Sequence, residues 1–158
     1  MRLLLALLFG TTLLLAAPVP KDKKKTDDAE AILGSWAGET FDDAGAFKGP
    51  SKEQFQKLRY VFKKDTEFKM LTGREDEFQG SFKMNKTTDP KSIDIELKNP
   101  VEQKFLGLYE LDGESLKICY TIRAEKKRPK ELKAIQGETY VMTFKRVVEE
   151  KKEEKKDK

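Results

Sequence analysis

Apolar and polar side chains alternate along most of this chain, with the period of two that a half-buried β-strand shows. The breaks between the alternating runs carry glycine, proline, asparagine and aspartate, which favour turns. About eight short strands follow from this pattern. The apolar positions of one parity are Leu58, Tyr60 and Phe62, then Phe68 and Met70, then Phe78, Phe82 and Met84, then Ile93, Ile95 and Leu97, and finally Tyr140, Met142 and Phe144.

Residues 104–123 form the best-specified part of the pattern, because two alternating runs meet at the turn signal Asp112-Gly113. A type I′ turn centred on these two residues pairs Tyr109 with Leu116, Gly107 with Ile118 and Phe105 with Tyr120 on one face. The opposite face is mostly polar. A slip of one residue would exchange the two faces, whereas a slip of two would preserve them.

Successive hairpins leave two exposed sheet edges unless the sheet closes on itself. We therefore expect an all-β fold, an antiparallel up-and-down barrel of about eight strands, with an open sandwich as the alternative. Asp27 and Glu30 have the spacing of a capping box and predict a short helical turn before the first strand. Ser51 and Gln54 have the same spacing within a region that is otherwise a long loop, and predict a second helical turn.

The chain divides into four segments. Residues 1–17 combine a positive start with an apolar run of 15 residues and predict a signal peptide. The run is shorter than the roughly 20 residues of a membrane-spanning helix, although an uncleaved anchor is the alternative. Residues 18–30 are expected to be a flexible linker, 31–147 the barrel domain and 148–158 a charged disordered tail whose i,i+4 pairs repel. The mature protein is then secreted or periplasmic, not inserted in a membrane, and monomeric.

Composition excludes several kinds of chemistry. The 158 residues include 32 basic and 28 acidic side chains, one cysteine and no histidine. The sequence has no basic stripe with interleaved aromatic residues, the pattern that nucleic-acid binding requires. Without histidine and with one cysteine, it also lacks the usual zinc ligands and the usual general base. We expect no metal, no cofactor and no catalytic residue. Cys119 fits a small packing residue within a strand better than a reactive thiol.

Four tyrosines, Tyr60, Tyr109, Tyr120 and Tyr140, all fall on the inward parity. A buried phenol needs a hydrogen-bond partner, which is either another protein group or a ligand in a small pocket. Tyr109 and Tyr120 are the preferred ligand-binding candidates, because Gly107 beside them leaves room on that wall. About ten aromatic rings point inward and predict a filled or half-filled interior, since a barrel of eight strands holds at most one small ligand.

Several motifs together resemble a known family. They are Gly34-x-Trp36 with Arg146, then the segment around Asp94, then Gly107 to Asp112-Gly113, then Cys119, and finally Arg128-Pro129. Their order resembles the lipocalin-like, calycin-type family of short exported proteins of unknown function that is abundant in planctomycete bacteria. The resemblance implies a barrel whose floor packs Trp36 against Arg146, and bacterial export, but no activity. Glu114 and Leu132 depart from the family pattern.

Three functions remain open from the sequence. The leading hypothesis is a non-enzymatic envelope binding module that recognises a small apolar or aromatic ligand or an envelope protein. The second is a loop-mediated inhibitor or protein-interaction domain with a filled barrel, acting through loops such as 41–50. The third is an enzyme that uses a tyrosine or a carboxylate as its acid or base, because histidine is lacking.

Overall fold

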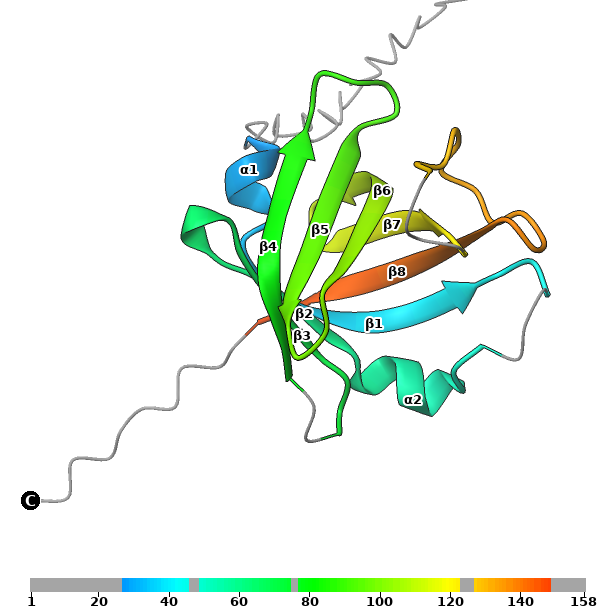
Figure 1. Cartoon of the computed structure of the whole chain (residues 1–158), viewed down its shortest axis with the longest axis horizontal. Coiled ribbons are helices and arrows are strands. Elements are labelled where there is room, and N and C mark those ends of the chain that lie inside the picture. The colour runs from blue at the N-terminus through cyan, green and yellow to red at the C-terminus, as the bar shows by residue number, and fades with distance from the viewer. Residues whose placement is uncertain (1–26, 46–48, 75–76, 123–126, 149–158) are drawn as a thin grey trace, which may run out of the picture.

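A computed structural model describes residues 27–45, 49–74, 77–122 and 127–148. Eight antiparallel strands follow one another around a closed barrel, and the last strand pairs with the first (Figure 1). This architecture confirms the predicted up-and-down barrel. The strands are β1 (Gly34–Asp42), β2 (Arg59–Phe62), β3 (Glu67–Leu71), β4 (Glu77–Asn85), β5 (Ser92–Asn99), β6 (Gln103–Asp112), β7 (Ser115–Thr121) and β8 (Thr139–Val147).

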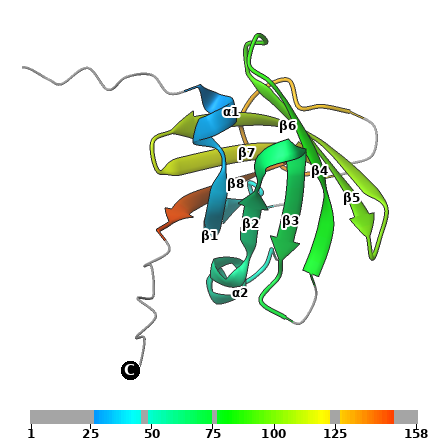
Figure 2. The same ribbon diagram turned by 90° about the vertical axis from the view of Figure 1, so that its left-hand side faces the viewer.

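Two short α-helices lie at opposite ends of the barrel (Figures 1 and 2). Helix α1 (Asp28–Ala31) precedes β1 at the end that also holds the turns after β2, β4 and β6. We call this end the floor; the 3-10 turn η1 (Lys64–Thr66) belongs to it. Helix α2 (Lys52–Lys57) lies at the other end, the mouth, with the connections after β3, β5 and β7.

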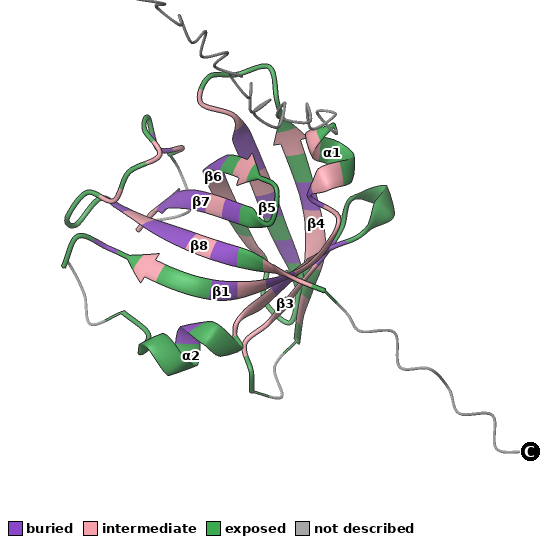
Figure 3. Cartoon of the chain, turned by 180° about the vertical axis from the view of Figure 1, so that it is seen from behind, coloured by how far each residue is buried: buried purple, intermediate pink, exposed green. Residues whose placement is uncertain are grey.

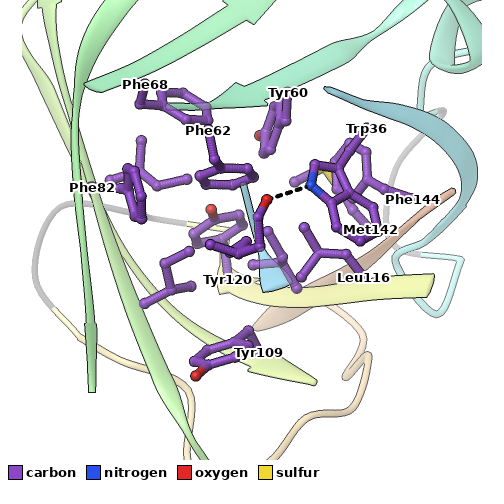
Figure 4. Close-up of a cluster of buried hydrophobic side chains, with 14 of the residues drawn as sticks. Trp36, Tyr60, Phe62, Phe68, Phe82, Tyr109, Leu116, Tyr120, Met142 and Phe144 are labelled. Carbon is purple, nitrogen blue, oxygen red and sulfur yellow. Dashed lines mark hydrogen bonds between the residues drawn. The ribbon is translucent and has the colours of Figure 1, made fainter. Parts of the chain in front are cut away.

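The predicted inward parity is kept in the strands from β2 to β8, whereas the register of β1 shifts between Gly38 and Thr40. Residues of the inward parity are buried or partly buried, and Figure 3 shows the buried positions recurring along the strands. Aromatic rings fill much of the interior (Figure 4): Tyr60 stacks on Phe144 at 4.5 Å between ring centroids, and Phe62 meets Phe82 edge-on at 5.0 Å. Side chains rather than solvent therefore occupy the middle of the barrel.

The central hairpin differs from the prediction by two residues. Tyr120 lies opposite Gly107, Ile118 opposite Tyr109 and Leu116 opposite Leu111. The turn is centred on Gly113 and Glu114, with a positive φ of 57° at Gly113 alone, as in a type II′ turn. The predicted type I′ turn at Asp112-Gly113 is therefore wrong, whereas the faces are correct because a shift of two preserves them.

The outer face of this hairpin is less polar than the sequence suggested. Leu108 and Cys119 are buried there with Val141, and Leu132 and Ala134 of the β7–β8 connection cover them. The Cys119 thiol donates to the Lys133 carbonyl at 3.6 Å, and burial raises its pKa. Cys119 is thus a packing residue in this structure.

Arg128 and Pro129 anchor the same connection to the barrel wall. Pro129 is buried, and the Arg128 guanidinium donates to the carbonyl of Gly107 at 2.5 Å. It also pairs with the Asp94 carboxylate at 2.5 Å. These contacts give three residues of the family-like motif a structural role, which is to hold the connection across β5 and β6.

Both predicted helical turns are present. The Asp27 side chain caps α1 by accepting from Ala29 N at 3.1 Å, and α1 begins within the range that we assigned to the linker. The capping box of α2 is complete, since Ser51 accepts from Gln54 N and Gln54 accepts from Ser51 N. Residues 1–26 and 149–158, which include the predicted signal peptide, most of the predicted linker and the predicted disordered tail, lie outside the described residues.

The described residues contain neither a membrane-spanning helix nor a metal-binding cluster. No helix in the described ranges has the length and apolar character to cross a membrane. Among the same residues, no three side chains of histidine, cysteine, aspartate or glutamate lie close enough together to hold a metal ion.

The floor is organised around Trp36 and Arg146. The indole of Trp36 is fully buried and donates to the Ile32 carbonyl at 2.8 Å. The Arg146 guanidinium lies over the indole at 4.2 Å from its centroid and donates to the carbonyls of Leu33, at 2.8 Å, and Ala31. The contact between Trp36 and Arg146 has the expected geometry.

We predict that Arg146→Ala lowers the free energy of unfolding by about 2 kcal/mol or more, because it removes a cation–π contact and leaves two carbonyls without their donor. Urea denaturation followed by tryptophan fluorescence measures this directly. Arg146→Lys keeps a cation near the indole but lacks the planar pair of donors, so we expect an intermediate loss. An unchanged midpoint and emission spectrum for Arg146→Ala would contradict this role.

Candidate functional site: the barrel mouth

Three of the four tyrosines lie near one another in the barrel interior, Tyr120 and Tyr140 towards the mouth and Tyr60 opposite Trp36. Tyr120 and Tyr140 are partners across β7 and β8, with ring centroids 5.9 Å apart. Burial raises the pKa of Tyr120 well above its ordinary value, and the neighbouring phenols of Tyr60 and Tyr140 raise it further. Burial also raises the pKa of Tyr60, and that of Tyr140 to about 12. All three phenols are therefore neutral near pH 7.

Tyr109 lies apart from this group, at the floor. Its hydroxyl donates to the Asp28 carboxylate at 2.9 Å and points away from the ring cluster in Figure 4. Lys91 pairs with the same carboxylate at 2.6 Å. Burial alone would raise the pKa of Asp28, but the hydrogen bonds from Lys91 and Tyr109 outweigh it, and the pKa lies below its ordinary value. The Tyr109 hydroxyl therefore has a structural role, because it joins β6 to α1.

The Tyr120 hydroxyl is buried and has no hydrogen-bond partner among the described residues. The space that we expected Gly107 to leave for a ligand is filled by the Tyr120 ring itself. A Cβ atom at Gly107 would lie 2.7 Å from that ring. This wall of the barrel is therefore packed, and Gly107 provides room for its cross-strand partner.

We predict opposite effects for two matched substitutions. Tyr109→Phe removes a hydrogen bond to a carboxylate and should lower the free energy of unfolding by about 1.5 kcal/mol. Tyr120→Phe removes a buried hydroxyl that has no partner, and should leave stability unchanged or slightly higher. Denaturant unfolding of the two variants decides the matter, and a larger loss in Tyr120→Phe would show that its hydroxyl has an unseen structural partner.

A ring of partly buried apolar side chains surrounds the mouth. These residues pack against the core while keeping part of their surface exposed, and they come from β1, β3, β4, β6, β8 and the end of α2: Phe41, Met70, Phe78, Phe105, Tyr140 and Leu58. Phe55 of α2 is buried beneath this ring. Its ring centroid lies 5.8 Å from that of Phe41 and 5.7 Å from that of Phe144. The mouth is therefore apolar and partly covered by α2.

A groove opens beside α2 at this end. It has a volume of about 400 Å³ and runs between the helix and the β3–β4 turn, within the size range of small-molecule sites. Its apolar surface comes from Pro50, Phe55 and Leu58, and its polar surface from Gln54, Lys57, Thr72, Gly73 and Arg74.

Three polar side chains of the groove, Lys57, Thr72 and Arg74, have no side-chain partner within the described structure. Lys57 and Arg74 form no ion pair with any residue of the described ranges. The Thr72 hydroxyl oxygen is buried and has no hydrogen-bond partner within the described structure. The groove thus combines an apolar surface with two cations and one unused hydroxyl.

Within the described residues, three other hollows lie on the outer surface of β3 to β6. Their volumes are about 300, 360 and 430 Å³. Most of the residues that line them are charged or polar, among them Lys69, Lys98, Glu96 and Lys104. The mouth groove is the better candidate, because three apolar side chains line it and it lies at the mouth of the barrel, a common position for ligand sites.

The sequence did not predict the groove. It did predict the parts, since Ser51 and Gln54 marked the helical turn and Thr72-Gly73 marked the turn after β3. The packing of these segments depends on contacts between residues far apart in the sequence. A Cβ atom at Gly73 would lie 2.4 Å from the Cβ of Lys57, which shows how closely the turn approaches α2.

Comparisons with known proteins add little to this picture. No protein-family model matches the chain, and no curated protein matches it. Among solved structures, a DUF4847 family protein from Bacteroides vulgatus is similar, with 13% sequence identity and a TM-score of 0.46. The alignment covers 73% of this chain and 93% of that protein. The likeness is too distant to carry an argument about function.

Proposed function

We propose that this chain is an exported, non-enzymatic binding module that holds a small apolar or aromatic ligand at the mouth of its barrel. The observation that supports this proposal is the groove beside α2, with its apolar surface and unpaired polar groups. The resemblance to short exported lipocalin-like proteins agrees with this function, because the mouths of β-barrels are common ligand sites.

The ligand occupies the groove and the apolar ring rather than the deep interior. Rings already fill the space below the mouth, and the Tyr120 hydroxyl is enclosed. Inserting a ligand there would require the displacement of packed side chains, which is costly in a close-packed core. Tyr140 is the tyrosine best placed to contact a ligand, since it is partly exposed at the mouth.

We expect the purified protein to bind the apolar fluorophore N-phenyl-1-naphthylamine, with a rise in its emission. Leu58→Ser should weaken binding about fivefold, because it removes roughly 1 kcal/mol of apolar contact at the groove. Val148→Ser is the matched control, since Val148 is 72% exposed at the floor end, and its affinity should equal that of the parent. Absence of binding by the parent protein would overturn the ligand function and favour a protein-interaction domain with a filled barrel.

Export is a separate part of the proposal. Expression of the full chain in a bacterium should yield a soluble protein outside the cytoplasm whose sequence begins near Ala17 or Pro18, because the apolar run is too short to anchor it stably. Amino-terminal sequencing of the extracytoplasmic fraction tests this. A chain that begins at Met1 and sediments with the membranes would contradict it.

A further inference from the structure

We infer that the ligand of the mouth groove carries an acidic group, a carboxylate or a sulfonate, attached to its small apolar or aromatic body. This inference rests on the proposed function and adds the charge of the ligand to it. The groove contributes a place for each part, since Phe55 and Leu58 are apolar while Lys57 and Arg74 are cationic.

The two cations come from different elements and line one groove. Lys57 is the last residue of α2, and Arg74 follows the end of β3 by three residues. Glu53, one turn before Lys57 on α2, forms no ion pair with it. Glu75 and Asp76 lie outside the described residues. Among the residues that line the groove, none is acidic.

Hydrogen bonding favours the same kind of ligand. The planar guanidinium of Arg74 can donate two parallel hydrogen bonds to a carboxylate or sulfonate. Thr72 precedes Arg74 by two residues and lines the same groove. Its buried hydroxyl has no acceptor within the described structure. An acidic oxygen at this point would supply the missing acceptor.

The barrel interior offers no alternative position for an acid. The guanidinium of Arg146 is the inward cation of the described strands, and the floor carbonyls of Ala31 and Leu33 already engage it. The phenols of Tyr60, Tyr120 and Tyr140 stay neutral, because burial raises their pKa values. Burying an unpaired anion among them would carry a large desolvation cost. The acid therefore remains at the mouth, and the apolar body lies against Phe55 and Leu58.

The test compares two competitors of the same shape, 2-naphthoate and 2-naphthamide, for displacement of N-phenyl-1-naphthylamine at neutral pH. We expect the naphthoate to bind about tenfold more tightly. Its advantage should shrink as sodium chloride is raised, because salt screens exposed charges. The double variant Lys57→Gln and Arg74→Gln should reduce the advantage to about twofold or less, with the affinity of each competitor calculated from that variant's own Kd for N-phenyl-1-naphthylamine.

Lys52→Gln is the matched control, since Lys52 is an exposed lysine of the same helix that does not line the groove. It should preserve the preference for the naphthoate. Thr72→Val removes the hydroxyl without changing the shape of the side chain, and should weaken naphthoate binding by about three- to tenfold. Circular dichroism confirms that each variant is folded.

Each outcome separates this inference from the proposed function. Equal competition by the two naphthalenes, or a preference that survives the double variant, overturns the acidic ligand while the binding of the apolar fluorophore stands. Failure of the parent protein to bind the fluorophore overturns both. A stronger preference for the neutral naphthamide would show that a polar but uncharged group occupies the groove.

Discussion

The rest of the fold depends on the contacts that the Arg146 guanidinium makes with the Trp36 indole and with the carbonyls of Ala31 and Leu33. This side chain sits on the closing strand pair of the barrel, where Arg146 of β8 lies opposite Trp36 of β1. Its donors satisfy carbonyls at the end of α1, a helix of four residues that is too short to be stable alone. One side chain therefore joins barrel closure, the buried indole and the covering helix, and a second contact from α1, through Asp28 to Tyr109 and Lys91, fixes the same end.

This arrangement separates the two ends of the barrel. Hydrogen bonds and ion pairs with partly buried groups hold the floor, so that its polar groups are already engaged. The mouth is held mainly by ring packing and by α2, and it retains unpaired polar groups and partly exposed apolar side chains. A ligand gains most from groups that have no partner within the protein, since no internal hydrogen bond has to be broken first. The mouth is therefore the end suited to binding.

The sequence predicted the barrel and the inward faces, because both depend on local periodicity, and the floor contact between Trp36 and Arg146 was implied by the resemblance to lipocalin-like proteins. It predicted the wrong register at the central hairpin, because a shift of two leaves every face unchanged and Asp112-Gly113-Glu114 allows two turn types. It predicted Cys119 as a packing residue but missed the burial of Leu108 and the cover over both side chains, since that cover comes from a connection with no periodic signal. Tyr109 is separated from the other phenols because it lies near the floor end of β6, and its partner Asp28 comes from α1, whose position no pattern in the strands encodes.

The groove could not be predicted from the sequence, because its shape depends on close backbone contacts at two glycines. Its wall is α2, and α2 can approach β1 only because Gly38 lacks a side chain: a Cβ there would lie 2.2 Å from the Phe55 carbonyl oxygen. On the other side, Gly73 lets the β3–β4 turn contact Lys57. Both glycines resemble ordinary strand or turn residues in the sequence, yet each sets the position of one side of the groove. A larger residue at Gly38 would push α2 away from the apolar ring, remove Phe55 from between Phe41 and Phe144, and open the barrel interior that the helix now covers. The shape of the mouth therefore depends on backbone contacts as much as on the side chains that line it.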